Sequence, residues 1–286
     1  MSKHVTKILN GRGLAAKRRM SLKQKIANEK MQPMIAVFMI GQDVESDSYQ
    51  SFVEQASETG ILVETVELKS NVNEEKVYKL IEKLNRTKKV HGIVVQFPVP
   101  APFDIRELGA AIDVEKDIDC IHPENIGWLS LGAPRYMPSM TQAIWTMVDA
   151  AAIQVKGKHV VLIGANNIVG KPTAQLLANH GATTTLCHSL TENLEEYTSQ
   201  ADIIITATGK AEYLQASMVK DDVVIIDAGA TRNDEGEIVG DVDYDAVAEK
   251  ASYITPVPDG VSPMTVVSLF ENTWKAACLQ EGIDSE

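Results

Sequence analysis

Residues 161–172 read VLIGANNIVGKP, and this stretch decides the fold. An apolar run that ends at Ile163 meets Gly164, a short loop leads to Gly170, and the helical pattern TAQLLANHG follows. Glycine lets the backbone turn sharply and approach a ligand closely, and the N-terminus of a helix offers free N–H groups to phosphate. The order of strand, glycine turn and helix therefore predicts a dinucleotide-binding site.

The prediction of a dinucleotide site needs support from the rest of the chain, because the spacing of these glycines is not the usual G-x-G-x-x-G. It is also not a P-loop, since Pro172 occupies the position where Ser or Thr would hold magnesium. Taken alone, the stretch fits an ordinary strand-to-helix turn equally well. Residues 183–189, 201–209 and 223–230 add three short apolar runs that alternate with helical stretches. That alternation is typical of a parallel sheet with crossover helices.

Length and composition restrict the class of protein. The chain has 286 residues, enough for two domains, and its 44% hydrophobic and 23% charged residues are typical of a globular protein. A net charge of -12 argues against nonspecific binding to nucleic acid but allows a local basic pocket for phosphate.

Cys120, Cys187 and Cys278 lack metal-ligand spacing, so we expect no metal site, and their sparse number suits the cytoplasm. We expect neither a signal peptide nor a membrane span, because no sufficiently long apolar run occurs.

The first half of the chain has an α/β rhythm of its own. Gly60 is a candidate C-cap, and Pro263 stands at the expected first position of the last helix. Residues 114–138 lack periodicity and are expected to form a loop-rich boundary. The expected helices are 14–30, 46–60, 73–86, 140–152 and 263–280, and the expected strands are 34–41, 61–68 and 90–97. The expected domains are residues 1–139, with residues 263–286 packing back on them, and residues 140–262.

Five separate motifs occur in one order along the chain. They are GIVVQFPVP (92–100), KDIDC-x-HP (116–123), IGANNIVGKP (163–172), IVGDVDY (238–244) and YITPVPDGVSPMT (253–265). Together they resemble the bifunctional methylenetetrahydrofolate dehydrogenase/methenyltetrahydrofolate cyclohydrolase family over nearly the whole chain. The resemblance implies an α/β protein with an N-terminal α/β folate domain, a C-terminal Rossmann-type NAD(P)-binding domain and an active-site cleft between them. It also implies a homodimer.

The sequence departs from the family pattern mainly in the motifs expected to face folate. The family's Tyr-x-x-x-Lys has Tyr49 here, but Val53 replaces the lysine. The family's Pro-Cys-Thr-Pro-x-Gly reads PSMTQA at 138–143, and its Pro-Gly-Gly-Val-Gly-Pro-Met-Thr reads PDGVSPMT at 258–265. Cys120 stands where a glycine is usual after KDID.

The two family reactions make different demands on these residues. Hydride removal from a carbon between two nitrogens needs no strong base, because the nitrogen lone pairs stabilise the cation. Cyclohydrolysis adds water and opens a ring, and its proton transfers need an ionisable group. A valine side chain can neither take nor give a proton. We therefore expect an NADP-dependent methylenetetrahydrofolate dehydrogenase of one-carbon metabolism with weak or lost cyclohydrolase activity. Lys69 or a water could still replace the missing lysine.

The resemblance assigns the folate site by matched position. It implies catalytic roles for Tyr49, Gln96 and Asp119, with Asp119 binding the pterin. Gln96 follows four apolar residues of a strand that is expected to be buried, so we expect it to be buried with a hydrogen-bond partner. Tyr49 could otherwise be a half-buried aromatic, and Asp119 a loop-capping residue beside Asp113 and Asp117. Asp259 could repel folate, bind an amine-bearing substrate or lie on the surface. The expected substrate-binding residues are Tyr49, Val53, Gln96, Asp119, Asp259 and Gly260.

The resemblance also assigns the cofactor site. His188 and Ser189 follow the second Rossmann strand, where an acidic residue would favour NAD by pairing with the 2′-hydroxyl. Neither residue is acidic, which favours NADP, and Lys171 is a possible positive charge nearby. NAD remains possible. The expected cofactor-binding residues are Gly164, Ala165, Asn166, Ile168, Val169, His188, Ser189, Thr208, Gly209 and Thr265.

Two other interpretations remain open at this point. One is a repurposed paralogue that keeps the cofactor and acts on a different substrate, which the changes at Met140, Asp259 and Ser262 favour. The other is a non-catalytic folate- or NADP-binding protein, which predicts binding without turnover.

Overall fold

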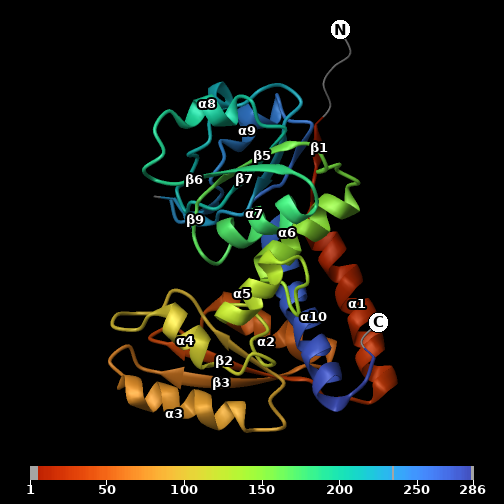
Figure 1. The fold of residues 1–286 in the computed structure, drawn as a ribbon, viewed down its shortest axis with the longest axis vertical. Helices are drawn as coiled ribbons and strands as arrows, with labels where there is room; N and C mark the ends of the chain where they lie inside the picture. The colour runs from red at the N-terminus through yellow and green to blue at the C-terminus, as the bar shows by residue number, and fades with distance from the viewer. Residues whose placement is uncertain (1–5, 234, 285–286) are drawn as a thin grey trace. The chain divides into compact units, whose positions relative to one another are not determined.

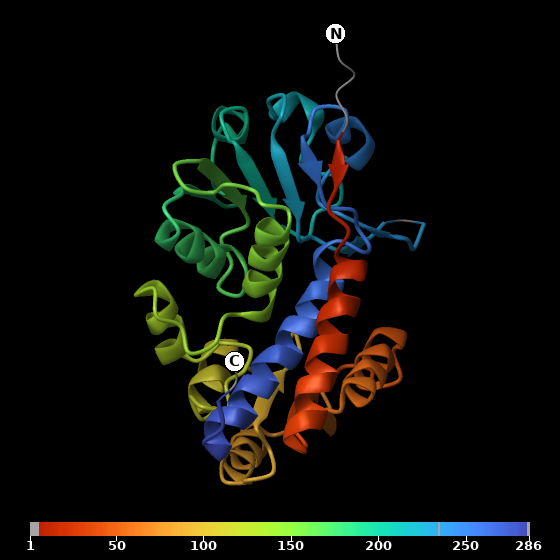
Figure 2. The same ribbon diagram turned by 90° about the vertical axis from the view of Figure 1, so that its right-hand side faces the viewer.

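The computed structural model describes residues 6–233 and 235–284, which divide between two compact units (Figures 1 and 2). The N-terminal unit contains residues 16–129, 133–139 and 266–286, and the central unit contains residues 130–132 and 140–265 with the chain start up to residue 15. Residues 1–5 and 285–286, which belong to the expected end segments, lie outside the described residues, as does residue 234.

The central unit is built on a six-stranded sheet in the order β1-β11-β8-β7-β5-β6, with every neighbouring pair parallel. The inner strands are almost wholly buried, as expected where helices cover both faces of a parallel sheet. The predicted parallel sheet is therefore confirmed. Its strands are β1 (Lys7–Ile8), β5 (His159–Ile163), β6 (Thr183–Cys187), β7 (Ile203–Thr206), β8 (Val224–Asp227) and β11 (Tyr253–Ile254).

Short helices connect these strands. A hairpin of β9 and β10 and a single 3-10 turn at 216–218 complete the unit. The strands β1 and β11 escaped prediction because each has two residues, which are too few to show a period. The remaining elements are α6 (Ser139–Ala150), α7 (Gly170–Asn179), α8 (Leu194–Thr198), α9 (Tyr244–Ala248), β9 (Thr231–Arg232) and β10 (Ile238–Val239).

The N-terminal unit has a parallel sheet of three strands in the order β3-β2-β4. Strand β2 is central and sends alternate side chains to two cores: Val37 joins one with Tyr49 and Phe270, and Phe38 joins the other with Ile81. The strands are β2 (Met34–Ile40), β3 (Leu62–Leu68) and β4 (Gly92–Val95), and the helices are α2 (Asp47–Thr59), α3 (Glu74–Asn85), α4 (Ile105–Ala111) and α5 (Pro123–Ser130).

Two long helices, α1 (Gly11–Glu29) and α10 (Val261–Glu281), contain residues of both units and run side by side in Figures 1 and 2. Within the N-terminal unit, Leu22 of α1 lies in the same buried cluster as Phe270 and Trp274 of α10. Arg18 donates to Glu271 at 2.7 Å across the same contact. Residues 266–281 thus complete the core of the N-terminal unit.

One local prediction is confirmed and two are corrected. Gly60 has a φ of 94° directly after α2, as a helix C-cap requires. Residues 114–138 contain the helix α5, which is too short to show a period in the sequence. Helix α10 starts at Val261, so Pro263 lies at its third position and not at its first.

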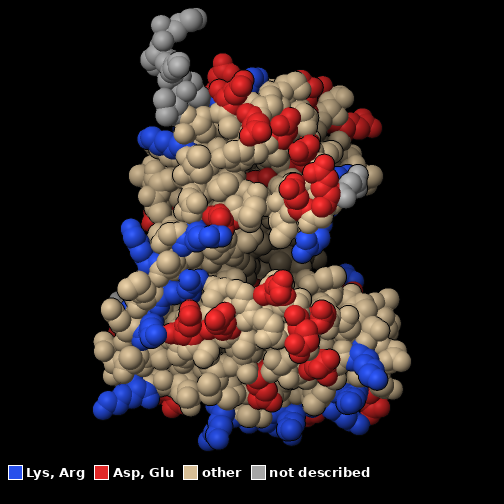
Figure 3. All heavy atoms as spheres, turned by 180° about the vertical axis from the view of Figure 1, so that it is seen from behind, with Lys and Arg blue, Asp and Glu red and all other residues tan. Residues whose placement is uncertain are grey.

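Acidic and basic side chains are mixed on the face drawn in Figure 3, and Asp and Glu outnumber Lys and Arg by 39 to 27 in the chain. Of the helices formed by the described residues, none combines the length and apolar character needed to cross a membrane.

Candidate functional site

The glycine turn between β5 and α7 is a place of close backbone approach. Gly164 has a φ of 117°, and a Cβ on it would lie 2.3 Å from the carbonyl oxygen of Ala207. A Cβ on Gly170 would lie 1.8 Å from the carbonyl oxygen of Gly164. Since real side chains cannot occupy either position, both glycines are required by the turn itself, which matches the prediction from the sequence.

Asn166 holds the shape of this turn through its side chain. Its Oδ1 accepts the N–H groups of Ile168 at 3.1 Å and Val169 at 2.7 Å, and its Nδ2 donates to Ala207 O at 3.3 Å. Two of the N–H groups expected to wrap pyrophosphate are therefore engaged within the turn. Lys171 donates to Asn167 at 2.8 Å and is exposed at the start of α7.

The residues after β6 and β7 lie beside the glycine turn, because β5 pairs with both strands. His188 is exposed after β6, and its Nδ1 accepts the N–H of Leu190 at 3.2 Å. Ser189 is exposed next to it. Thr208 and Gly209 follow β7, and Thr208 Oγ1 accepts the N–H of Lys210 at 3.1 Å. The carboxyl ends of three adjacent strands thus bring together most of the expected cofactor residues.

Thr265 belongs to the same unit but lies on α10. Its hydroxyl is engaged within the unit, at 3.2 Å from Met140 Sδ and 3.3 Å from the carbonyl oxygen of Val261. Met140 is one of the positions that depart from the family pattern, and its sulfur here contacts an expected cofactor residue.

Tyr49 is buried on α2, in the N-terminal unit. Its ring stacks on Phe52 at a centroid distance of 6.0 Å, and its hydroxyl lies 2.6 Å from Thr65 Oγ1. Burial raises the pKa of Tyr49, and the Thr65 hydrogen bond lowers it in part. Val53 follows one turn later and packs half-buried against the same apolar cluster.

The predicted burial of Gln96 is wrong. Strand β4 ends at Val95, so Gln96 is exposed, and the hydrogen bond of its Nε2, to Phe97 O, is long at 3.5 Å. Gln42, which the sequence did not single out, donates from Nε2 to Gln96 O at 2.9 Å and to Pro98 O at 2.5 Å. Its Oε1 is buried without a partner among the described residues. Gln42 therefore braces the segment that carries Gln96.

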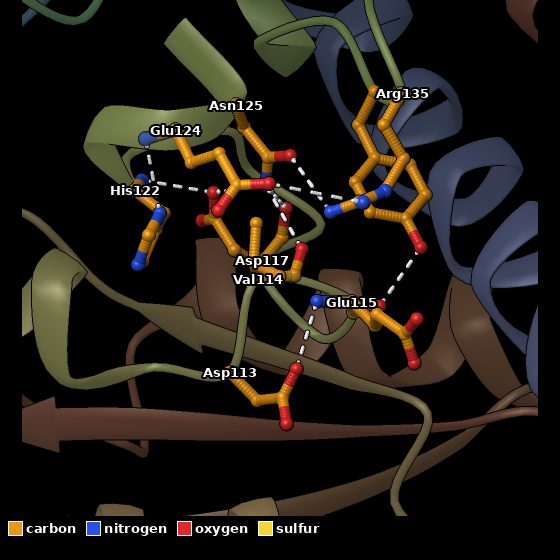
Figure 4. A network of polar contacts seen from close by, with 9 residues as sticks. Asp113, Val114, Glu115, Asp117, His122, Glu124, Asn125 and Arg135 are labelled. Atoms are coloured by element: carbon orange, nitrogen blue, oxygen red, sulfur yellow. Dashed lines mark hydrogen bonds and ion pairs between the residues drawn. The ribbon is translucent and has the colours of Figure 1, made fainter. Parts of the chain in front are cut away.

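The two aspartates of the motif KDIDC differ in their hydrogen bonds, and Figure 4 shows the contacts of the first, Asp117. Asp117 is fully buried and accepts the N–H groups of Ile121 at 2.9 Å and His122 at 2.8 Å, and an amide hydrogen of Asn125 at 2.8 Å. It therefore holds the loop that starts α5. The capping function considered for Asp119 belongs to Asp117.

Asp119 is left with a free oxygen. Its Oδ1 accepts the hydroxyl of Ser139 at 2.5 Å and the N–H of Ser139 at 3.4 Å, while Oδ2 has no hydrogen bond from the described residues. Burial raises the pKa of Asp119 to about 6, and the Ser139 hydroxyl works against that increase. Cys120 follows at a φ of 57°, which explains why a glycine suits this position.

Asp259 has a partner that the sequence did not reveal. Its Oδ1 accepts from Arg12 at 2.9 Å (Nε) and 2.6 Å (Nη2), and its φ is 81°. The negative charge that Asp259 carries, where the family pattern has glycine, is therefore balanced by Arg12 within the central unit. Gly260 is buried, and a Cβ on it would lie 2.3 Å from Pro256 O, so the second glycine of the motif is required by packing.

Comparison with known proteins decides the family. Residues 9–119 match the catalytic domain of the tetrahydrofolate dehydrogenase/cyclohydrolase family, and residues 138–281 match its NAD(P)-binding domain. The chain belongs to this family. It is thus an enzyme of tetrahydrofolate one-carbon metabolism with an NAD(P)-binding domain.

Relatives agree over nearly the full length. The bifunctional protein FolD of Oceanobacillus iheyensis is 41% identical over 274 residues, which cover 94% of this chain and 96% of the relative. The solved FolD structure from Campylobacter jejuni has a TM-score of 0.92 and 40% identity, and the match covers 96% of this chain and 99% of that one. The Trypanosoma brucei FolD structure, solved with NADP and an inhibitor, has a TM-score of 0.88 and 30% identity over 95% and 97% of the two chains.

The residues of the central unit fit the dinucleotide that the family implies. At Gly164 and Gly170 a Cβ would collide with backbone oxygens, so only glycines allow this tight turn, which leads directly into the N-terminus of α7. The free N–H groups of a helix N-terminus suit the phosphates of a dinucleotide. Asp259 and Gly260 also belong to this unit, whereas Tyr49, Val53, Gln96 and Asp119 belong to the N-terminal unit.

Proposed function

We propose that this chain oxidises methylenetetrahydrofolate with NADP and has lost most of the methenyltetrahydrofolate cyclohydrolase activity. The observation that carries the proposal is the environment of the Tyr49 hydroxyl. Its partner is the hydroxyl of Thr65 at 2.6 Å, and the position one helical turn away, where the family pattern has lysine, is Val53.

The electrostatics of Tyr49 support this proposal. A lysine ammonium beside a phenol would lower the phenol's pKa, because the positive charge favours the phenolate. Instead, burial raises the pKa of Tyr49, and a neutral hydroxyl is the group that opposes it. The pair Tyr49 and Val53 therefore offers a ring and a methyl surface to a substrate but no ionisable amine for proton transfer.

Hydride removal makes fewer demands, and the remaining residues suffice for it. When bound, NADP would accept the hydride, and the folate nitrogens would stabilise the cation that remains. Within the proposal, Tyr49 packs against the substrate, Gln96 offers an exposed amide, and Asp119 binds the pterin through its free Oδ2. Their contribution is positioning, which by itself supplies much of the catalysis in such a step.

The preference for NADP is also part of the proposal. Gly164, Ala165, Asn166, Ile168 and Val169 would surround the pyrophosphate, with Thr208, Gly209 and Thr265 nearby in the same unit. The residues after β6 are His188 and Ser189, where a carboxylate would favour the free 2′-hydroxyl of NAD. The ammonium of Lys171, exposed at the start of α7, can pair with a 2′-phosphate. The Trypanosoma brucei relative was solved with NADP.

A different substrate receives less support from the geometry than from the sequence. The carboxylate of Asp259 suggested an amine-bearing ligand, but Arg12 already occupies its Oδ1. The homodimer implied by the family and the cytoplasmic location favoured by the sparse cysteines remain part of this proposal. Light scattering on the purified protein tests the dimer.

A paired spectroscopic assay on the purified protein tests the function. One arm follows reduction of NADP, and separately of NAD, with methylenetetrahydrofolate. The other arm follows the decay of methenyltetrahydrofolate without a cofactor. We expect NADP reduction with methenyl hydrolysis at least about a hundredfold slower, the lower end of what a positioned acid–base group contributes. Matching rates in the two arms would refute the loss of cyclohydrolase, and binding without any reduction would indicate a non-catalytic protein.

A further inference from the structure

Asp241, within the IVGDVDY motif, is fully buried beyond the carboxyl ends of β7 and β8. Its carboxylate accepts two backbone hydrogen bonds from the loop that follows β7. Oδ2 accepts the N–H of Thr208, and Oδ1 accepts the N–H of Lys210 at 3.1 Å. Because both oxygens are used, the carboxylate fixes the course of residues 207–210.

The loop that Asp241 holds packs directly against the glycine turn. The N–H of Ala207 donates to Ile163 O at 2.8 Å, and Ala207 O accepts from Asn166 Nδ2 at 3.3 Å. That same oxygen lies 2.3 Å from the place where a Cβ on Gly164 would stand. Any movement of residues 207–210 therefore changes the wall against which the turn is built.

The segment that carries Asp241 packs reciprocally against the segment that carries Asp227, at the end of β8. A Cβ on Gly229, two residues after Asp227, would lie 2.1 Å from Asp241 Oδ1, and a Cβ on Gly240 would lie 2.0 Å from Asp227 Oδ2. Asp227 Oδ2 accepts the N–H of Val242 at 3.0 Å. Each aspartate thus fills the space that the glycine of the other segment leaves open.

We propose that Asp241 is a positioning residue for NADP, which holds the loop 207–210 against the glycine turn. Gly229 leaves room for its carboxylate, and Asp227 holds the segment 240–242 that carries it. The proposal rests on nucleotide binding by the central unit and is independent of the fate of the cyclohydrolase. It assigns to the GDVDY motif a function in cofactor affinity, although Asp241 is buried and takes no part in the chemistry.

The test compares Asp241→Asn with Asp202→Asn. Asp202 precedes the amino end of the same strand β7, and its carboxylate accepts the N–H of His159 at 3.0 Å and the amine of Lys220 at 2.7 Å. The two variants make the same chemical change at opposite ends of one strand. Calorimetric titration with NADP alone gives the dissociation constant without any folate, so the result does not depend on turnover. Steady-state kinetics then give KM for NADP, KM for methylenetetrahydrofolate and kcat.

We expect Asp241→Asn to raise the dissociation constant and KM for NADP about tenfold, the equivalent of one buried hydrogen bond. KM for methylenetetrahydrofolate and kcat at saturating NADP should stay within about threefold, and Asp202→Asn should bind NADP like the parent. A second variant, Gly229→Ala, displaces the same carboxylate without removing its charge and should weaken NADP binding in the same way.

Parent-like affinity for NADP in either folded variant would overturn the proposal, as would an equal loss of affinity in Asp202→Asn. Failure of both Asp241→Asn and Gly229→Ala to fold would assign the contact to stability alone and would also overturn it. If the parent itself bound no NADP, the proposed function would fail and not this inference alone.

Discussion

Restoring an amine beside Tyr49 is the sharpest test of how this site works. Tyr49 and Val53 stand four residues apart on α2, so their Cβ atoms lie about 6 Å apart on one face of the helix. A lysine at position 53 can therefore reach the Tyr49 hydroxyl. The variant Val53→Lys should hydrolyse methenyltetrahydrofolate at least about a hundredfold faster than the parent, since a positioned acid–base group contributes about 10²–10⁴ in rate.

The structural cost of this change should be small. Val53 is half-buried at the edge of the apolar cluster around Tyr49 and Phe270, and burying a whole valine side chain stabilises by about 1.5–3 kcal/mol. Because Val53 is only half-buried, its replacement loses about half of the lower figure in stabilisation. The aliphatic stem of the lysine recovers part of this free energy by lying along the same apolar surface. We therefore expect a loss of less than about 1 kcal/mol in the free energy of unfolding, measured by urea denaturation.

The assay follows methenyl decay in the parent, in Val53→Lys and in the matched control Val53→Met, which has a long stem without an amine. Adding Thr65→Val to Val53→Lys releases the Tyr49 hydroxyl from its present partner and should raise hydrolysis further. Dehydrogenase kcat should change less than about threefold in all variants, because hydride removal needs no base. The reasoning is refuted if Val53→Lys folds and hydrolyses no faster than Val53→Met.

Three further outcomes follow from the same structure. Burial raises the pKa of Asp119 from 3.8 to about 6, so the folded protein favours the protonated carboxyl. The contribution of this group to the free energy of unfolding is therefore fully present below pH 3.8 and is lost as pH rises through 6. Unfolding from pH 4 to 8 should show this loss, which Asp119→Asn should abolish, and in the parent KM for folate should rise below pH 6 as the carboxylate is protonated. Because Cys120 has a φ of 57°, Cys120→Gly should be more stable than Cys120→Ala by about 1 kcal/mol, the reverse of the usual order, in denaturant titrations. Arg12→Ala leaves Asp259 uncompensated and should raise KM for the anionic folate a few-fold at low salt, and the added change Asp259→Gly should reverse it; an unchanged KM would place this pair away from the substrate.

Part of the fold and of the site followed from local demands of the backbone. The stretch at 161–172 predicted the strand, turn and helix because Gly164 and Gly170 meet steric conditions that no other residue meets. Alternating apolar runs predicted the parallel sheet because buried strands and crossover helices leave periods of their own. The helix α5 was missed because Asp117, and not an apolar period, holds its start.

The tertiary structure alone decided how the polar side chains are used. Only the folded chain shows that Asp117 caps a loop while Asp119 keeps a free oxygen, because that depends on where each side chain points. Arg12 meets Asp259 across 247 positions, and Asp241 meets Thr208 across 33. Such pairs join segments that are distant in the chain, so no spacing or period encodes them. The sequence by itself therefore determined the sheet, the glycine turn and the family, and packing decided which carboxylate oxygens have hydrogen-bond partners within the fold.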